Sequence, residues 1–453
     1  MSRHWFSSSI LVVLVPLGLW AQAGGPTPFG SGAVPQLSFA GAAAPSNLVS
    51  FSVSSTMGYN TNIAAVGQGA EGGTFVSLGP RISVVRQGEH VVLDLDYYPN
   101  YLFYPGHEQY DQFNQALALN MSFKLGPRIT LQIRDSLSRA TANFQPGLSN
   151  SSVSIPGLGP PTTLNQTVYT GSAPQQNNAA RVDLTYRKSG RTSFGAFAGF
   201  DQQHFIGKPA NGQQLFNTQG TSGGLRYAYR ISEHTSLGVV YLYQDFNFAR
   251  NQSLIGAQSR TVTHSVFASF AWQLAPSVTL SVFGGPQYIP SEEYFVQSPI
   301  LPGGSGTIVN PLFRSQWNEA AGGALTKQAE KTAFSLTAQR SVSNGGGLLT
   351  AATSSSVGMG ASRKLRRGWD ANFNLTFAST DNLTLPSLPR NQISTETATL
   401  ALNHPLSESL SAQLSYTFVH QSNVALLPVA ATLDSSRLSL SFSYRAKSIP
   451  LSH

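Results

Sequence analysis

Two short patterns in the sequence could carry enzymatic chemistry. Gly220, Ser222 and Gly224 give the Gly-x-Ser-x-Gly spelling of a nucleophile elbow, a motif that works where a strand turns sharply into a helix. Here the motif opens a segment with the period of a strand, and no helical pattern follows. Glu292 and Glu293 form a possible acid/base pair, but they fall in an expected outer loop, where a solvated pair is the commoner arrangement.

No metal or cofactor site is indicated. The nine histidines include no two at the spacing of metal ligands, and the chain has no cysteine, which excludes thiolate ligands, disulfides and thiol catalysis. We therefore predict that the protein binds no cofactor and is not an enzyme. An outer-membrane hydrolase whose Ser and His come from distant strands is the less favoured alternative.

The charged residues form a more informative pattern, because many alternate with apolar residues. Leu225, Tyr227 and Tyr229, for example, alternate with Arg226 and Arg230, and successive side chains of a strand point to opposite faces. We predict that the charged set lines a wet interior, with seven basic residues against three acidic ones. The predicted lumen residues are Arg81, Asp94, Asp96, Arg134, Arg181, Asp183, Arg187, Arg226, Arg230 and Arg437.

Two interpretations of these arginines remain open. An arginine-lined aqueous channel favours anions or anionic sugars. Alternatively, Arg81 and Arg134 could pair with Asp94, Asp96 or Asp183 on neighbouring strands and only stiffen the wall.

The elements that must position these side chains are long amphipathic strands. Eighteen segments alternate apolar with small polar residues, and most exceed the ~9–11 residues of a transmembrane β-strand. We predict an all-β, up-and-down antiparallel barrel of about eighteen strands, of the bacterial outer-membrane type. The predicted strands are 48–60, 74–86, 90–104, 113–125, 128–140, 178–188, 192–205, 219–231, 235–249, 260–274, 277–291, 314–327, 331–344, 353–366, 368–380, 392–404, 408–421 and 433–447.

The connections between these segments alternate in length. Tight turns such as 126–127, 189–190 and 275–276 alternate with long connections such as 141–177 and 292–313. Outer-membrane barrels have short periplasmic turns and long extracellular loops. The alternation therefore predicts that both ends of the barrel segment lie in the periplasm.

The first residues indicate export. Arg3 and His4 precede an apolar run over 10–20, which ends in an A-x-A cleavage pattern over 21–23, as in a secretory signal peptide. We predict a signal peptide over 1–23, a flexible periplasmic segment over 24–47, the barrel over 48–447 and a short tail over 448–453. Charged residues are 11% of the chain, less than half of the ~25% usual in soluble domains.

Four segments, 57–63, 79–82, 94–98 and 110–113, carry a family resemblance. Here the chain resembles the beta-barrel porin 2 family of outer-membrane barrels found beside exopolysaccharide export systems. The resemblance implies a barrel channel, with secreted polysaccharide as one possible cargo. One departure is that Phe442 and Tyr444 are followed by a tail, whereas many barrels end on an aromatic residue that the assembly machinery recognises.

We therefore predict a porin-like channel in the outer membrane of a Gram-negative-type bacterium. Its expected partners are membrane lipid, the barrel-assembly machinery, and small polar or anionic solutes or polysaccharide. Nucleic acid is not expected, because the net charge of +8 is spread singly along the chain rather than clustered. A barrel occluded by the connection 141–177, with a structural or binding role, is the alternative. The oligomeric state is left open.

Overall fold

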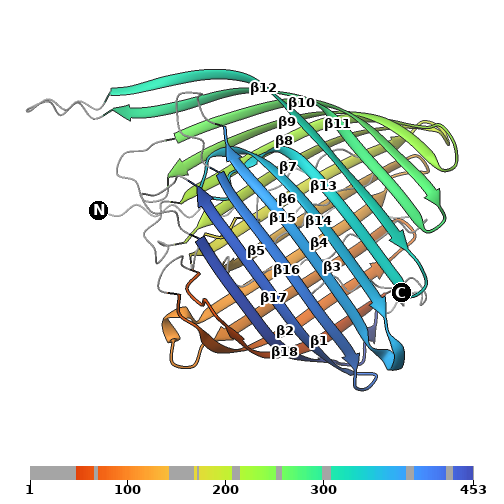
Figure 1. Cartoon of the computed structure of the whole chain (residues 1–453). Coiled ribbons are helices and arrows are strands. Elements are labelled where there is room, and N and C mark those ends of the chain that lie inside the picture. Colours follow the sequence, from red (N-terminus) through yellow and green to blue (C-terminus); the bar gives the residue numbers. More distant parts are fainter. Residues whose placement is uncertain are drawn as a thin grey trace, which may run out of the picture.

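The structure, a computed structural model, describes residues 47–65, 70–141, 168–170, 173–206, 215–250, 258–297, 308–383, 392–424 and 432–451. Within these ranges, eighteen long strands run antiparallel in chain order and a two-residue strand follows them (Figure 1). Their bounds are β1 Leu48–Asn60, β2 Gly73–Gln87, β3 Val91–Phe103, β4 Gln112–Lys124, β5 Ile129–Thr141, β6 Pro174–Arg187, β7 Thr192–Phe205, β8 Phe216–Arg230, β9 Thr235–Arg250, β10 Gln258–Ala275, β11 Val278–Gln297, β12 Ile308–Gln328, β13 Thr332–Asn344, β14 Ala351–Lys364, β15 Asp370–Asn382, β16 Gln392–Pro405, β17 Leu410–Val424, β18 Thr432–Arg445 and β19 Ile449–Pro450.

The sheet closes on itself, because β1 pairs with β2 on one side and with β18 on the other. Val53 lies opposite both Pro80 and Tyr444, and β1 lies beside β18 in Figure 1. The short β19 pairs with the start of β1. The predicted fold class, an antiparallel barrel of eighteen strands, is confirmed.

The only regular helical elements among the described residues are two 3-10 turns, η1 Glu108–Tyr110 and η3 Arg366–Gly368. No helix in the described ranges is long and apolar enough to span a membrane. In η3, Arg367 and Gly368 adopt positive φ angles of 59° and 78°, which make the tight turn from β14 to β15.

The clearest difference from the sequence prediction is the hairpin of β11 and β12. A loop over 292–313 was expected, but β11 continues to Gln297 and β12 begins at Ile308. The two extensions pair with each other, as between Phe295 and Asn310. Half of their residues over 292–297 and 308–313 are β-branched or aromatic, and such residues favour strands. Glu292 and Glu293 therefore lie in a strand and not in a loop, which corrects the prediction.

The outer face of the barrel carries a band of exposed apolar side chains. Leu225, Tyr227 and Tyr229 are 63%, 40% and 38% exposed, as expected for the outward positions of β8. Comparable side chains on other strands include Leu78, Ile82, Val182, Leu184, Val239, Val266, Leu375, Phe377, Leu414 and Leu438. A soluble monomer rarely exposes so large an apolar surface, so this face contacts lipid.

A charge placed on this face should destabilise the barrel. We expect Leu375→Lys, in the middle of β15, to lower the free energy of unfolding by roughly 2–4 kcal/mol, as lysine does at the bilayer midplane. The neighbouring inward substitution Thr376→Lys is the matched control, because its side chain is on the lumen side. Urea unfolding in lipid vesicles measures both; equal costs would contradict the assignment of the two faces.

Inward-facing glycines let large side chains lie flat along the wall. A Cβ at Gly224 would overlap the ring of Phe197 on the adjacent β7. The ring therefore covers the neighbouring strand and does not project toward the barrel axis. This arrangement keeps space inside a barrel whose inner face is partly aromatic.

Candidate functional site

The ten predicted lumen residues all occupy inward positions of their strands. Strand pairing places Arg134 beside Arg181 and Gly195 beside Arg226, so the basic positions of β5, β6 and β8 lie on one section of the wall. The structure brings Arg134, Arg181 and Arg226 together around Asp183. Of the remaining predicted residues, Arg81 and Asp96 form a separate pair.

Three guanidinium groups share the single carboxylate of Asp183, which is 0% exposed. Arg134 Nη2 lies 2.8 Å from Asp183 Oδ2, Arg181 Nε lies 3.0 Å from the same oxygen, and Arg226 Nη1 lies 3.3 Å from Oδ1. Arg226 also donates to the hydroxyl of Thr185. Three positive charges against one negative charge leave this cluster with a surplus of two positive charges.

The sequence of β7 makes the cluster possible. Arg226 must cross β7 to reach Asp183 on β6, and it crosses at Gly195, where a Cβ would overlap the arginine side chain. Arg181 is held from the other side, because its guanidinium carbon lies 4.3 Å from the centroid of the Phe197 ring, within the range of a cation–π contact. A glycine and a phenylalanine two residues apart thus position two arginines.

Arg81 pairs with Asp96, with Arg81 Nε 3.0 Å from Asp96 Oδ1, and both side chains are open to solvent. Arg81 and Arg134 therefore each pair with a carboxylate that the sequence analysis considered, Asp96 for Arg81 and Asp183 for Arg134. Arg230 donates to the backbone carbonyls of Ser232 and Glu233, at 3.2 Å each, and so fastens a short turn. Arg187 is the last residue of β6 and is exposed.

A second section of the wall is rich in hydroxyl groups. Inward serines and threonines of β1 and β14 to β18 bond to one another between strands, as in Thr56 to Ser441 at 2.8 Å and Ser415 to Ser439 at 2.7 Å. Thr399 and Thr417 make a similar contact at 3.3 Å. This section offers many donors and acceptors and also contains the charged Arg437 of β18.

A third section is apolar, which the sequence analysis missed. Phe197, Val240, Leu242, Phe267 and Ala320 are buried on the inner faces of β7, β9, β10 and β12. The sequence of β9 carries the signal for this apolar section, because β9 is apolar on both faces. Val240 and Leu242 point inward, while Val239 and Tyr241 are exposed outside. The interior, which the sequence analysis described by its charged residues, therefore also has an apolar section.

The tip between β13 and β14, residues 345–350, crosses the lumen at the end where the long connections lie. β12 pairs with β13 only from Ala321 opposite Arg340 to Gln328 opposite Ala333, so the last residues of β13 leave the wall. Gln287 of β11 accepts a hydrogen bond from the freed N–H of Val342 at 3.4 Å. This break in the ladder lets the tip bend inward.

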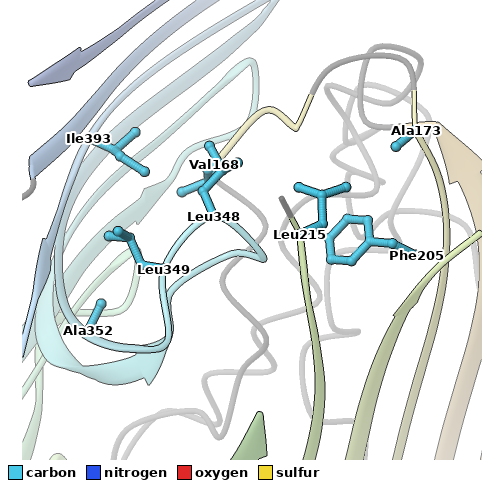
Figure 2. Close-up of a cluster of buried hydrophobic side chains, with 8 residues drawn as sticks. All are labelled: Val168, Ala173, Phe205, Leu215, Leu348, Leu349, Ala352 and Ile393. Carbon is cyan, nitrogen blue, oxygen red and sulfur yellow. The ribbon is translucent and has the colours of Figure 1, made fainter. Parts of the chain in front are cut away.

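The tip contacts the wall formed by β7 and β8. Asn344 Nδ2 donates to Gln203 Oε1 at 2.9 Å, and the Gly347 carbonyl accepts from the N–H of Phe216 at 2.8 Å. Gly347 has a φ of 87° and faces the Phe205 ring, which a Cβ would overlap. Figure 2 shows the resulting apolar cluster, made of Val168, Ala173, Phe205, Leu215, Leu348, Leu349, Ala352 and Ile393.

A second crossing is made by residues 168–170 of the connection 141–177, which was expected to occlude the lumen. Residues 142–167 and 171–172 of this connection lie outside the described ranges. The backbone N–H of Tyr169 donates to Gln421 Oε1 at 2.7 Å, and Gln421 Nε2 donates back to the Tyr169 carbonyl at 3.0 Å. Burial raises the pKa of the Tyr169 phenol, which therefore stays protonated.

The motifs considered for catalysis do not form a site in the described residues. Ser222 lies inside β8, and a strand continues on both sides of it, so the elbow geometry is absent. No group of three or more His, Asp or Glu side chains in the described ranges could hold a metal ion.

A closed antiparallel barrel of eighteen strands, apolar outside and with polar and charged groups inside, is an outer-membrane β-barrel. Its place is the outer membrane of a Gram-negative-type bacterium. Its strand number is that of the 16–18-stranded porins, which enclose an aqueous channel.

No protein-family model matches the chain, and no curated protein matches it either. The outer-membrane barrel that the resemblance implied is therefore supported, but membership of the beta-barrel porin 2 family is not. Similar solved structures include OccK2 (OpdF) of Pseudomonas aeruginosa in complex with glucuronate, with 12% identity, coverage of 89% of this chain and 100% of that chain, and a TM-score of 0.41. The ferric-catecholate import receptor Fiu of E. coli K12 has 10% identity, coverage of 89% and 82%, and a TM-score of 0.44. Likeness of this degree carries no argument about function.

Proposed function

We propose that the protein is an outer-membrane channel for polar and anionic solutes. The observation that carries the proposal is the cluster of Arg134, Arg181 and Arg226 around one buried carboxylate. Its surplus positive charge lies on the inner wall, where a low-dielectric surround strengthens its field. A pore with such a lining attracts anions and repels cations.

The hydroxyl-rich section of β1 and β14 to β18 extends the proposal to acidic sugars. Its serines and threonines can exchange hydrogen bonds with the hydroxyl groups of a saccharide, while the arginines attract carboxylates. Secreted polysaccharide, which the family resemblance implies as a cargo, is a larger solute that carries the same hydroxyl and carboxylate groups. The proposal includes the signal peptide over 1–23 and insertion by the barrel-assembly machinery.

The two crossings support a second candidate, a closed barrel with a binding or structural role. The tip at 345–350 and the segment 168–170 both contact the opposite wall through hydrogen bonds and apolar packing. In this candidate the crossings are permanent, and the lumen conducts little or no current.

Single-channel recording in a planar bilayer under a salt gradient tests the channel and its selectivity. We expect a stable conductance with a reversal potential that favours anions. The double substitution Arg181→Gln with Arg226→Gln leaves Arg134 paired one-to-one with Asp183, so the surplus charge becomes zero. We expect this variant to lose most of the anion preference.

The matched control is Arg363→Gln. This arginine is exposed at an outward position near the end of β14, and its replacement removes a positive charge without touching the lumen. Unchanged selectivity in the double variant would return these arginines to a purely structural role. A folded barrel without conductance would favour the closed-barrel candidate.

A further inference from the structure

The tight turns, which gather at one end of the barrel in Figure 1, carry an excess of positive charge. These turns and the last two strand residues on either side of them hold more than half of the 28 lysines and arginines, but only a quarter of the 20 aspartates and glutamates. In outer-membrane barrels the tight turns face the periplasm. The periplasmic end is therefore basic, whereas acidic residues outnumber basic ones in the rest of the chain.

Five of these basic residues lie on two neighbouring turns, which join β4 to β5 and β6 to β7. We call Lys124, Arg128, Arg187, Lys188 and Arg191 the basic rim. Lys124 is half-buried and the other four are exposed. The N–H of Arg187 donates to the Arg128 carbonyl at 2.8 Å, so the two arginines are neighbours across the turns.

A structural role does not account for the basic rim. The ion pairs between Arg or Lys and a carboxylate in the described part of the chain involve none of its five residues. Like charges that face each other across neighbouring strands are destabilising. The basic rim therefore has charge available for an anion from outside the chain.

The basic rim faces the mouth of the barrel and not the lipid. On β6, Arg187 lies on the same face as the buried Asp183, whereas Tyr186 is exposed on the outer face. Lys124 likewise has inward parity on β4, and the next residue, Leu125, is outward and 60% exposed. A lipid headgroup would meet outward positions, so the basic rim is placed to meet a solute.

Positive charge continues from the basic rim into the lumen. Arg187 is four residues from Asp183, the centre of the arginine cluster, which is ~13 Å along a strand. Two basic groups separated in this way suit a ligand with several negative charges, because each further contact of a bound ligand is intramolecular. The crossings made by 345–350 and 168–170 lie at the other mouth, so a large solute meets the basic rim before it meets them only from the periplasmic side.

We propose that the basic rim is the entry site for an acidic oligosaccharide or polysaccharide chain that arrives from the periplasm. Carboxylates of the chain pair with the guanidinium and ammonium groups of the rim, and further carboxylates reach the arginine cluster. A mouth lined by one sign of charge raises the local concentration of the opposite charge by about 10–10³-fold. The inference rests on the proposed function, because it assigns an entry side and a multiply charged form to the same class of solute.

Side-specific block of single channels by tetragalacturonate tests the entry site. The chain has no cysteine, and a Cβ at Gly190, in the turn between β6 and β7, meets nothing within 4 Å. Gly190→Cys, present in every protein recorded, therefore gives one thiol whose reaction with an impermeant reagent after each recording shows which chamber the tight turns face. We expect tetragalacturonate to block from that side at an about tenfold lower concentration than from the other. Its uncharged methyl ester should block equally from both sides.

Two triple variants separate the mouth from the rest of the periplasmic end. Arg128→Gln with Arg187→Gln and Arg191→Gln should bring the ratio of the two blocking concentrations close to one. The matched control removes three positive charges from exposed outward positions at the same end of the barrel and should leave the ratio unchanged. The control substitutions are Arg86→Gln, Lys327→Gln and Arg363→Gln.

Binding of fluorescently labelled tetragalacturonate to the refolded proteins in detergent gives a second measurement, which needs no conductance. We expect the rim variant to bind about tenfold more weakly than the control variant, and added salt to weaken binding to the parent. Block at equal concentrations from both sides, or equal binding by the rim variant and the control, would overturn the entry site. The outcome is distinct from the test of the channel: a barrel without conductance that binds through the rim keeps the site and loses the channel, and an anion-selective channel blocked equally from both sides does the reverse.

Discussion

Replacing the β13–β14 tip with a tight turn should raise the single-channel conductance several-fold. Asn344 and Ala351 are paired residues of the two strands, so an Asn-Gly turn can join them directly in place of residues 345–350. The change removes Leu348 and Leu349, both almost fully buried in the cluster that crosses the lumen. It leaves β13, β14 and the arginine cluster intact.

The expected gain follows from steric width. In the parent protein the tip reaches β8, because the Gly347 carbonyl accepts from Phe216 N–H, and Asn344 at its base bonds to Gln203 of β7. Ions must therefore pass around the tip. The matched control is the turn between β16 and β17, where Leu406 bonds to Leu410 and Asn-Gly can replace residues 407–409. That turn lies at the opposite end of the barrel and should leave conductance unchanged. Equal conductance of the tip variant and the parent would show that the current is limited elsewhere.

Much of this architecture could be predicted because membrane strands obey a strict alternation. The ranges 48–60 and 192–205 agree with β1 and β7 at both ends, since each strand has one lipid face and one lumen face along its whole length. The same alternation placed Arg134, Arg181 and Asp183 on the inner face. Register between strands then brings them together, and register follows from turn length and pattern.

The features that could not be predicted depend on contacts between distant segments. Gln421 bonds to Tyr169, 252 residues earlier in the chain, and nothing local in the sequence marks either residue. The inward bend of the β13–β14 tip follows from the point where β12 leaves β13, and that point is a property of the whole barrel. The role of Gly195 likewise appears only when Arg226 is seen to cross it.

Asp183→Asn should be among the most destabilising single substitutions in the lumen. The carboxylate is 0% exposed and holds three guanidinium groups that are themselves 8% to 16% exposed. Removing one partner of a buried ion pair leaves uncompensated charge and costs about 3–5 kcal/mol. Urea unfolding in lipid vesicles measures the loss. Asp96→Asn is the control, because its partner Arg81 is 49% exposed and a solvated pair contributes about 1 kcal/mol or less.

The destabilisation and the ion selectivity of Asp183→Asn should change together, because both arise from the same charge imbalance. With the carboxylate gone, three positive charges remain, and the anion preference should rise where Arg181→Gln with Arg226→Gln lowers it. Combining all three substitutions leaves Arg134 as a single charge beside neutral amides, and most of the stability should return, as expected for residues that interact directly. If Asp183→Asn cost no more than Asp96→Asn, lumen water would be screening the cluster, and its field would be too weak to select anions.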